Sequence, residues 1–200
     1  MSQPQNENGS REPYPSQPRL TPLPLAEMSE RTREQLARNN LTPNGNEPLA
    51  IFATLARHPR LLASWLPFGG RLLAGGSLER RFTELIILRT AYNTGNVYEW
   101  GQHVEICTAL GIEQATIERI AEGPGAQGWS PLEALLLRAT DELHIERYIT
   151  GATWDALAES LDEARLIELC FLVGHYEMLA MFLRTVGVQL EPGKERFALP

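Results

Sequence analysis

Hydrophobic and polar positions repeat with a helical period through most of the chain. The segment "EPLAIFATLARH" places Leu49 and Phe52 on one face of a helix. Pro59 marks a break before a second helix, "RLLASWLPFGGRLLAG", which Pro67 and Gly69 are expected to disturb. No segment shows a convincing strand pattern. These patterns predict an all-α fold.

Two helices are predicted in the middle of the chain. Ser77 is a suitable N-cap for a helix over residues 78–93, and Gly95 closes it. Its centre, residues 85–88, is apolar on all sides, so this helix should be buried. A second helix is expected over residues 97–110.

The last third of the chain carries two strong helix starts. In "SPLE", Ser130 is the N-cap, Pro131 takes the first helical position and Glu133 the third, which predicts a helix reaching about Tyr148. Before it, "IEQATIERIAEG" predicts a shorter helix. A second capping box, beginning at Ser160, opens a long apolar helix through "LIELCFLVGHYEMLAMFLRTVG".

The amino-terminal segment differs in composition from the rest. Residues 1–45 are rich in Pro, Asn, Gln and Ser and poor in large apolar side chains, which predicts a disordered or extended arm. The first 19 residues are expected to be disordered, and a short helix is expected near "MSERTREQLARNN". A helical domain follows over residues 46–190, with a tail over residues 191–200.

Composition narrows the class of protein. The chain has 200 residues, 43% of them hydrophobic, which suits one domain with a sizeable core. The formal charge of -7 disfavours nucleic acid or an anionic membrane as a partner. No apolar run looks long enough to span a bilayer, and the polar start does not resemble a signal peptide, so we expect a cytoplasmic protein. Cys107 and Cys170 lie far apart, which predicts free thiols.

The stretch "ELIILRTAYNTGNVYEWGQH" carries the groups best suited to chemistry. At helical spacing, Asn96, Glu99, His103 and Cys107 form one stripe. If the preceding helix packs antiparallel to this one, Glu84 can face His103. A buried carboxylate beside an imidazole suits general acid–base catalysis on a small molecule.

Structural interpretations of the same residues stay open. Asn96 and Glu99 also fit a reciprocal helix cap. Glu84 also suits an ion pair with a neighbouring arginine, Arg80 or Arg81. His103 taken alone is more typical of a hydrogen-bonded core histidine.

A metal site has less support. Glu99 with His103, and Asp141 with His144, each have the spacing of two ligands on one helix face. No further ligand pair converges with them in the sequence, and such spacings are common on helices. We therefore expect neither a metal nor a cofactor.

The stretch "RFTELIILRTAYNTGNVYEWGQHVEICTALG", followed by "IEQATIERIAEG", resembles the carboxymuconolactone decarboxylase family, which includes the alkyl hydroperoxidase D (AhpD) branch. The resemblance covers most of residues 47–190 and implies an AhpD-like helical bundle. It also implies a homo-trimer or homo-hexamer. The peroxidase branch carries a C-x-x-C-x-x-x-H motif after a relay glutamate. With His103 as the motif histidine, Asn96 and Glu99 occupy the two cysteine positions, and Glu84 has the spacing of the relay glutamate.

The missing cysteines decide which activity the resemblance implies. Peroxide reduction needs a thiolate, which neither an amide nor a carboxylate replaces. The resemblance to the decarboxylase branch implies acid–base chemistry, of the lyase or hydrolase type, on a small acidic compound. His103 would donate or accept the proton, Glu84 would orient it and Glu99 would border the pocket.

The sequence also suggests substrate-binding residues and two alternative functions. The candidate substrate-binding residues are Arg81, Asn96 and Trp100, with the Arg81 guanidinium suited to a substrate carboxylate. One alternative function is an AhpD-like hydroperoxide reductase that uses Cys107. The other is a non-catalytic oligomeric helical protein in which the polar stripe only caps and connects helices.

Overall fold

The computed structural model describes residues 14–42, 45–194 and 199, and every regular element within them is helical. In chain order these are the 3-10 helix η1 (Leu25–Glu27) and the α-helices α1 (Glu30–Arg38), α2 (Ala50–Leu55), α3 (Pro59–Ala74), α4 (Arg80–Thr94), α5 (Val97–Ala109), α6 (Gln114–Glu122), α7 (Pro131–Ile145), α8 (Gly151–Ala158) and α9 (Glu163–Val186). The predicted all-α fold is confirmed.

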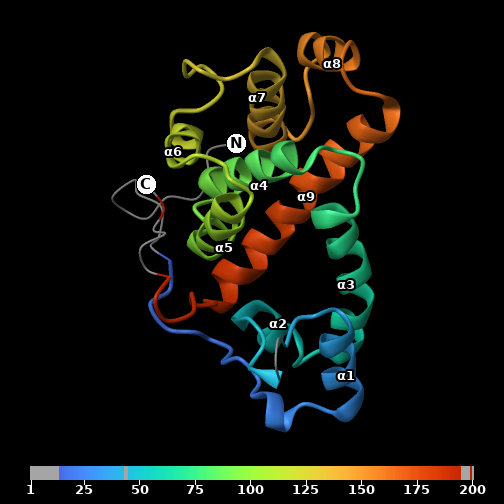
Figure 1. The fold of residues 1–200 in the computed structure, drawn as a ribbon, viewed down its shortest axis with the longest axis vertical. Coiled ribbons are helices and arrows are strands. Elements are labelled where there is room, and N and C mark those ends of the chain that lie inside the picture. The colour runs from blue at the N-terminus through green and yellow to red at the C-terminus, as the bar shows by residue number, and fades with distance from the viewer. Residues whose placement is uncertain (1–13, 43–44, 195–198, 200) are drawn as a thin grey trace.

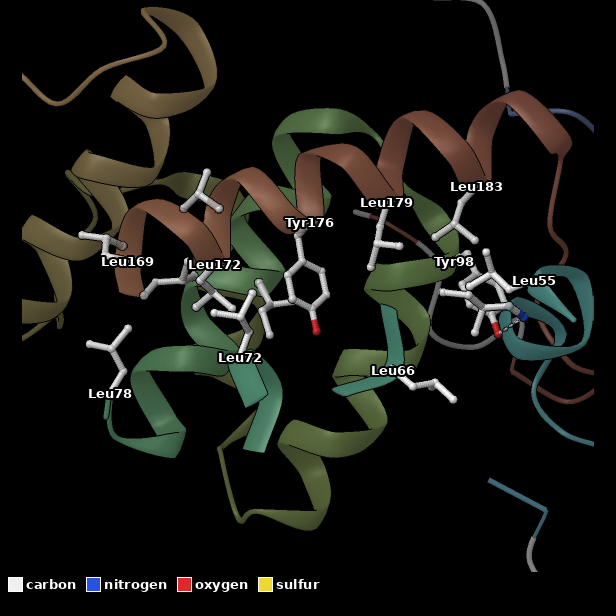
Figure 2. Packing of buried hydrophobic residues seen from close by; sticks show 14 of the residues in the cluster. Leu55, Leu66, Leu72, Leu78, Tyr98, Leu169, Leu172, Tyr176, Leu179 and Leu183 are labelled. Atoms are coloured by element: carbon white, nitrogen blue, oxygen red, sulfur yellow. Dashed lines mark hydrogen bonds between the residues drawn. The ribbon is translucent and has the colours of Figure 1, made fainter. Parts of the chain in front are cut away.

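Helices α4 and α9 organise the bundle. In Figure 1, α9 runs diagonally through the molecule, with α4 and α5 on one side and α3 on the other. Helix α4 contacts α5, α6, α7 and α9, so it has no solvent-facing side along its middle. The four consecutive residues Leu85 to Leu88 are fully buried, as their apolar pattern predicted. Figure 2 shows leucines of α9 meeting leucines of α3 in the main core.

Helix α9 corrects one expectation. It has 24 residues and contains an 18-residue apolar window, so by length and composition it could cross a membrane, although the sequence had suggested no run of that length. Just over half of its apolar window, 56%, is buried inside the protein. It contacts α3, α4, α7 and α8. Its apolar character therefore serves the core of this bundle.

Two helix starts differ from the prediction. Helix α4 begins at Arg80, because the backbone N–H of Ser77 donates to the carboxylate of Glu168 and is held away from the helix. Helix α9 is capped by Asp162, whose side chain accepts a hydrogen bond from the backbone of Arg165. The capping box of α7, Ser130 with Glu133, is present as predicted.

Helix α3 does not break where the sequence suggested. It continues through Pro67, which lies on its exposed side. Leu62, Leu66 and Leu72 are buried on the opposite side, before and after the proline. Packing of these leucines holds both halves of the helix in line, which offsets the hydrogen bond that proline removes.

The described part of the amino-terminal arm packs on the chain's own bundle. The hydroxyl of Tyr14 donates to the backbone oxygen of Val188 over 2.8 Å, and the N–H of Arg19 donates to Val186. The short helix predicted in this region is confirmed as α1, with Ser29 as its N-cap. Disorder was predicted for residues 1–19; residues 14–19 of this range are described and make the contacts above, whereas residues 1–13 lie outside the described residues. Residues 195–198 and 200 of the predicted tail lie outside them as well.

Candidate functional site

A tight turn between α4 and α5 builds the site. Gly95 ends α4 with φ 65°, a left-handed conformation that glycine adopts without a steric penalty. Asn96 follows as the N-cap of α5, and its side chain accepts a hydrogen bond from the backbone N–H of Glu99. The chain thus returns along α4, and residues 19 positions apart come face to face.

His103 lies between two carboxylates. Its Nδ1 is 2.6 Å from Oε2 of Glu84, and its Nε2 is 3.4 Å from Oε2 of Glu99. Glu84 is fully buried, and the other two side chains are almost so. Because Nδ1 donates to Glu84, that carboxylate fixes the orientation of the ring and leaves Nε2 for exchange with a ligand.

The charges around His103 favour its protonated form. Burial by itself lowers the pKa of His103, but the hydrogen bond and negative charge of Glu84, supported by Glu99, raise it from 6.5 to about 9. Arg80 lies one turn before Glu84, with Nη2 2.8 Å from Oε1 of that carboxylate. The result is an imidazolium at neutral pH, held in a buried row of alternating charge.

The cap interpretation of Glu99 holds only in part. In a reciprocal capping box the glutamate side chain would accept from the backbone N–H of Asn96, but that N–H donates to the carbonyl of Ala91. The carboxylate of Glu99 instead approaches His103. Asn96 therefore caps the helix, while Glu99 is available to the site.

A cavity of about 560 Å³ adjoins His103. His103 and Glu99 line it, whereas Glu84 lies behind the histidine and does not. Most of the other lining groups are apolar or aromatic, from α2, α3, α5 and α9, and include Leu49, Ile51, Phe52, Trp65, Leu66, Leu73, Tyr98, Ile106, His175, Tyr176 and Leu179. A volume of this size suits a small organic ligand.

The segment after α9 closes one side of this cavity. Glu191 accepts hydrogen bonds from the Tyr98 hydroxyl and from the backbone of Ala50, over 3.0 and 2.8 Å. Lys194, which lines the cavity, donates to Oε1 of Gln102 and lies 2.6 Å from the carboxylate of Glu105. This segment therefore joins α2 and α5 across the cavity.

The three predicted substrate-binding residues lie away from the cavity lining. The Arg81 guanidinium bonds to Glu133 of α7 over 2.8 Å. Asn96 is the helix cap described above, and Trp100 is buried in a second apolar cluster, its ring centroid 6.3 Å from that of Tyr92. The structure brings Glu84, Glu99 and His103 together, but does not bring these three to the same cavity.

Cys107 is not placed for redox chemistry. It is fully buried, does not line the cavity and is a free thiol. Burial, reinforced by the charge of Glu84, raises its pKa from 9.0 to about 12. A thiol of this kind supplies almost no thiolate at neutral pH, and the thiolate is the nucleophile in peroxide reduction.

Sequence reasoning missed part of the cavity wall. Trp65, His175 and Tyr176 were not among the predicted site residues. Their rings meet here, with Trp65 stacked on His175 at 5.8 Å and Tyr176 edge-on to His103 at 5.2 Å. The available signal was a histidine and a tyrosine side by side within an otherwise apolar helix.

A second histidine–glutamate pair joins α7 to α9. Nδ1 of His144 lies 2.5 Å from Oε1 of Glu177, but neither residue lines the cavity beside His103. Across the part of the chain that the structure describes, no group of three or more His, Cys, Asp or Glu side chains is arranged to hold a metal ion.

Comparison with solved structures defines the class of protein. An AhpD-core, peroxidase-related protein from Ralstonia eutropha JMP134 is similar over 92% of this chain and 93% of its own, with a TM-score of 0.74 and 16% identity. A peroxidase-related protein from Silicibacter sp. TM1040 is similar over 91% and 96%, with a TM-score of 0.76 and 12% identity. The chain has an AhpD-like fold.

The sequence of the central segment matches a known protein family. Residues 59–142, which contain Glu84, Glu99 and His103, match the model of the carboxymuconolactone decarboxylase family. This central segment thus matches the family named from the resemblance, and the chain as a whole shares the AhpD-like fold. The debrominase Bmp8, solved in complex with 2,3,4-tribromopyrrole, shares the fold over 89% of this chain and 94% of its own, with a TM-score of 0.72 and 15% identity. No curated protein matches the chain.

Proposed function

We propose that the protein is an acid–base enzyme of the lyase or hydrolase type, acting on a small compound bound beside His103. The observation that carries this proposal is the position of His103: one ring nitrogen bonds a buried glutamate, and the ring and a second glutamate line a cavity of about 560 Å³. The family match agrees with it, because the family is named for a decarboxylase.

The mechanism uses two groups of opposite role. Glu99, an acceptor on the cavity wall, takes a proton from the substrate. His103 donates a proton from Nε2 and keeps the proton on Nδ1 that bonds to Glu84. In a decarboxylation, the bond to the carboxylate carbon breaks, CO2 leaves, and the electron pair it leaves behind receives a proton from His103.

The cavity favours a small and mostly apolar compound. Its lining offers few charges, and Lys194 is already engaged by Glu105 and Gln102. His103 is thus the cation best placed for an acidic group on a substrate. The acidic substrate that the resemblance implied stays a prediction, and the binding roles of Arg81, Asn96 and Trp100 stay predictions as well.

Proton exchange tests this function without knowledge of the substrate. The protein is incubated in D2O with a panel of lactones, β-keto acids and cyclic ketones, and C–H exchange and CO2 release are followed by NMR and mass spectrometry. We expect activity toward members of the panel that His103→Asn and Glu99→Gln remove, while both variants keep the native circular dichroism spectrum. Equal rates in wild type and both variants would contradict the proposal.

An exposed apolar stripe on α9 supports self-association. Ile167, Phe171, Met178 and Met181 are each about half exposed or more and follow the four-and-three spacing of a coiled-coil seam, with Gly174 at its middle. Such a seam suits the same helix of a second copy. We therefore propose the homo-trimer or homo-hexamer that the resemblance implied.

A matched pair of substitutions tests the assembly. Ile167→Glu places a charge on the stripe, whereas Ile145→Glu places the same charge on another exposed isoleucine, on α7. Analytical ultracentrifugation should give three or six chains for wild type and for Ile145→Glu, and a smaller species for Ile167→Glu. A wild type that sediments as a monomer would rule the assembly out.

A further inference from the structure

Tyr176 is a polar group on the cavity wall that the acid–base pair leaves unused. It projects from α9, and Figure 2 shows its hydroxyl at the end of the ring, pointing away from the helix. The ring meets that of His103 edge-on, with centroids 5.2 Å apart. Tyr176 therefore reaches the same cavity as Nε2 of His103, from the opposite helix.

The hydroxyl of Tyr176 is available to donate a hydrogen bond to a ligand. Within the part of the chain that the structure describes, it makes no hydrogen bond, and burial, followed by the charges of Glu99 and Glu84, raises its pKa well above 10. The phenol accordingly stays neutral through the physiological range. The hydroxyl is open to the cavity rather than sealed in the core, so the oxygen of a ligand in the cavity can accept its hydrogen bond.

Two further polar atoms in this wall also lack partners. Nε1 of Trp65 and Nδ1 of His175 are buried and make no hydrogen bond within the described residues, and both side chains line the cavity. Burial lowers the pKa of His175 to about 4, so its ring is neutral. The α3 and α9 wall thus combines leucine side chains with three flat rings that carry neutral hydrogen-bonding groups, and it suits a planar ligand with oxygen substituents.

We propose that the Tyr176 hydroxyl and Nε2 of His103 together bind one carbonyl oxygen of the substrate. The inference rests on the proposed acid–base function. When Glu99 removes a proton from the carbon beside the carbonyl, the C–H electron pair moves toward the carbonyl and its oxygen becomes an enolate oxygen. Two donors then share that charge. Return of the proton from Glu99 to a different carbon completes an isomerisation. In a decarboxylation, the C–C bond to the carboxylate breaks, CO2 leaves, its electron pair forms the same enolate, and one proton delivered to carbon completes the step.

A phenolate imitates the enolate in a binding experiment. The probe is 4-nitrophenol, whose neutral and ionised forms have different absorption spectra. The protein carries the substitution Glu99→Gln. Residue 99 is then neutral, as the glutamate is after it has taken the proton from the substrate. We expect the probe to bind as the phenolate. Adding Tyr176→Phe removes only the hydroxyl and should weaken binding by roughly tenfold to a hundredfold.

Tyr92→Phe is the matched control, because Tyr92 loses the same atom but lies outside the cavity lining. Its affinity for the probe should equal that of the parent. Equal affinity with and without the Tyr176 hydroxyl would overturn the oxygen site, and so would the absence of phenolate binding to the parent.

The two proposals can fail separately. In the D2O experiment, Tyr176→Phe should lower the exchange rate by about a hundredfold or more, as expected for the loss of one donor to an oxyanion. Exchange that depends on His103 but not on Tyr176 would keep the acid–base function and reject the oxygen site. Phenolate binding that depends on Tyr176, in a protein that exchanges no proton in the panel, would do the reverse.

Discussion

Two histidine–glutamate pairs join helices in this protein, and their surroundings differ. His103 with Glu84 and His144 with Glu177 have nearly the same separation, 2.6 and 2.5 Å. His103 has a second carboxylate 3.4 Å from its other nitrogen, and it lines the cavity of about 560 Å³, which His144 does not line. The pair itself is thus a common way to connect helices, and access to a ligand from the free ring nitrogen makes it a candidate for catalysis.

The strongest test of this difference is to remove each histidine in turn. His103→Asn should lower turnover by about 10²- to 10⁴-fold, the usual contribution of a general acid. His144→Asn should leave turnover within about threefold, because that ring does not line the cavity. Rates are measured on the best compound of the exchange panel. Comparable losses in the two variants would mean that both pairs only hold the fold together.

The pH dependence of stability gives the second test. The pKa of His103 is raised from 6.5 to about 9 in the folded protein, so its protonation stabilises the fold fully below about pH 6.5, and this contribution disappears as pH rises through 9. The loss is on the order of 3 kcal/mol. Urea unfolding at pH 6, 7.5 and 9.5 should show it in wild type.

The same unfolding series in His103→Gln serves as the control. Without a titrating ring at this position, the decline in stability across the alkaline range should be much smaller. A wild-type curve that matches the variant would show that the buried row of charges does not hold the proton on His103.

Two adjacent arginines, one paired with Glu84 and one away from the cavity, provide a third test. Arg80 pairs with Glu84, whereas Arg81 pairs with Glu133 at a distance from the cavity. Because Glu84 orients His103, Arg80→Gln should alter kcat and its pH profile, by roughly tenfold in rate. Arg81→Gln should change kcat and KM by less than twofold. A KM raised strongly by Arg81→Gln would instead support the substrate-binding role suggested by the sequence.

Replacement of Cys107 should have the smallest effect on activity. Cys107→Ser leaves the cavity lining intact, so turnover should stay within about twofold, while the buried hydroxyl costs about 1 to 3 kcal/mol of stability. Steady-state rates and urea unfolding measure the two quantities. A hydroperoxide reductase activity that disappears with this substitution would revive the peroxidase alternative.

Local signals explain how much the sequence could predict. The turn at Gly95 and the cap at Asn96 lie within a few residues of each other, so the return of α5 along α4, and with it the meeting of Glu84 and His103, followed from spacing. The start of α4 did not, because it depends on a hydrogen bond to Glu168, 91 residues from Ser77 along the chain. Helix ends held by distant side chains leave no local pattern.

The role of Glu99 shows the same limit at the site. Its position three residues after Asn96 fits a cap and an acid–base residue equally well. Only the folded chain shows that the Asn96 N–H is already taken by Ala91, which leaves the carboxylate to His103. The cavity wall was harder still to predict, since Trp65 and Tyr176 are more than a hundred residues apart along the chain.

The reactive groups beside the cavity and much of its opposite wall come from two different parts of the chain. The segment that matches the family, residues 59–142, holds the reactive groups Glu84, Glu99 and His103. Much of the opposite wall, including Phe52, Tyr176 and Lys194, lies outside that segment. Changes in the flanking segments can therefore alter the ligand-facing wall while Glu84, Glu99 and His103 stay in place. Exchanging the flanking walls between AhpD-like proteins, with the central hairpin left intact, is a direct route to new substrate preferences.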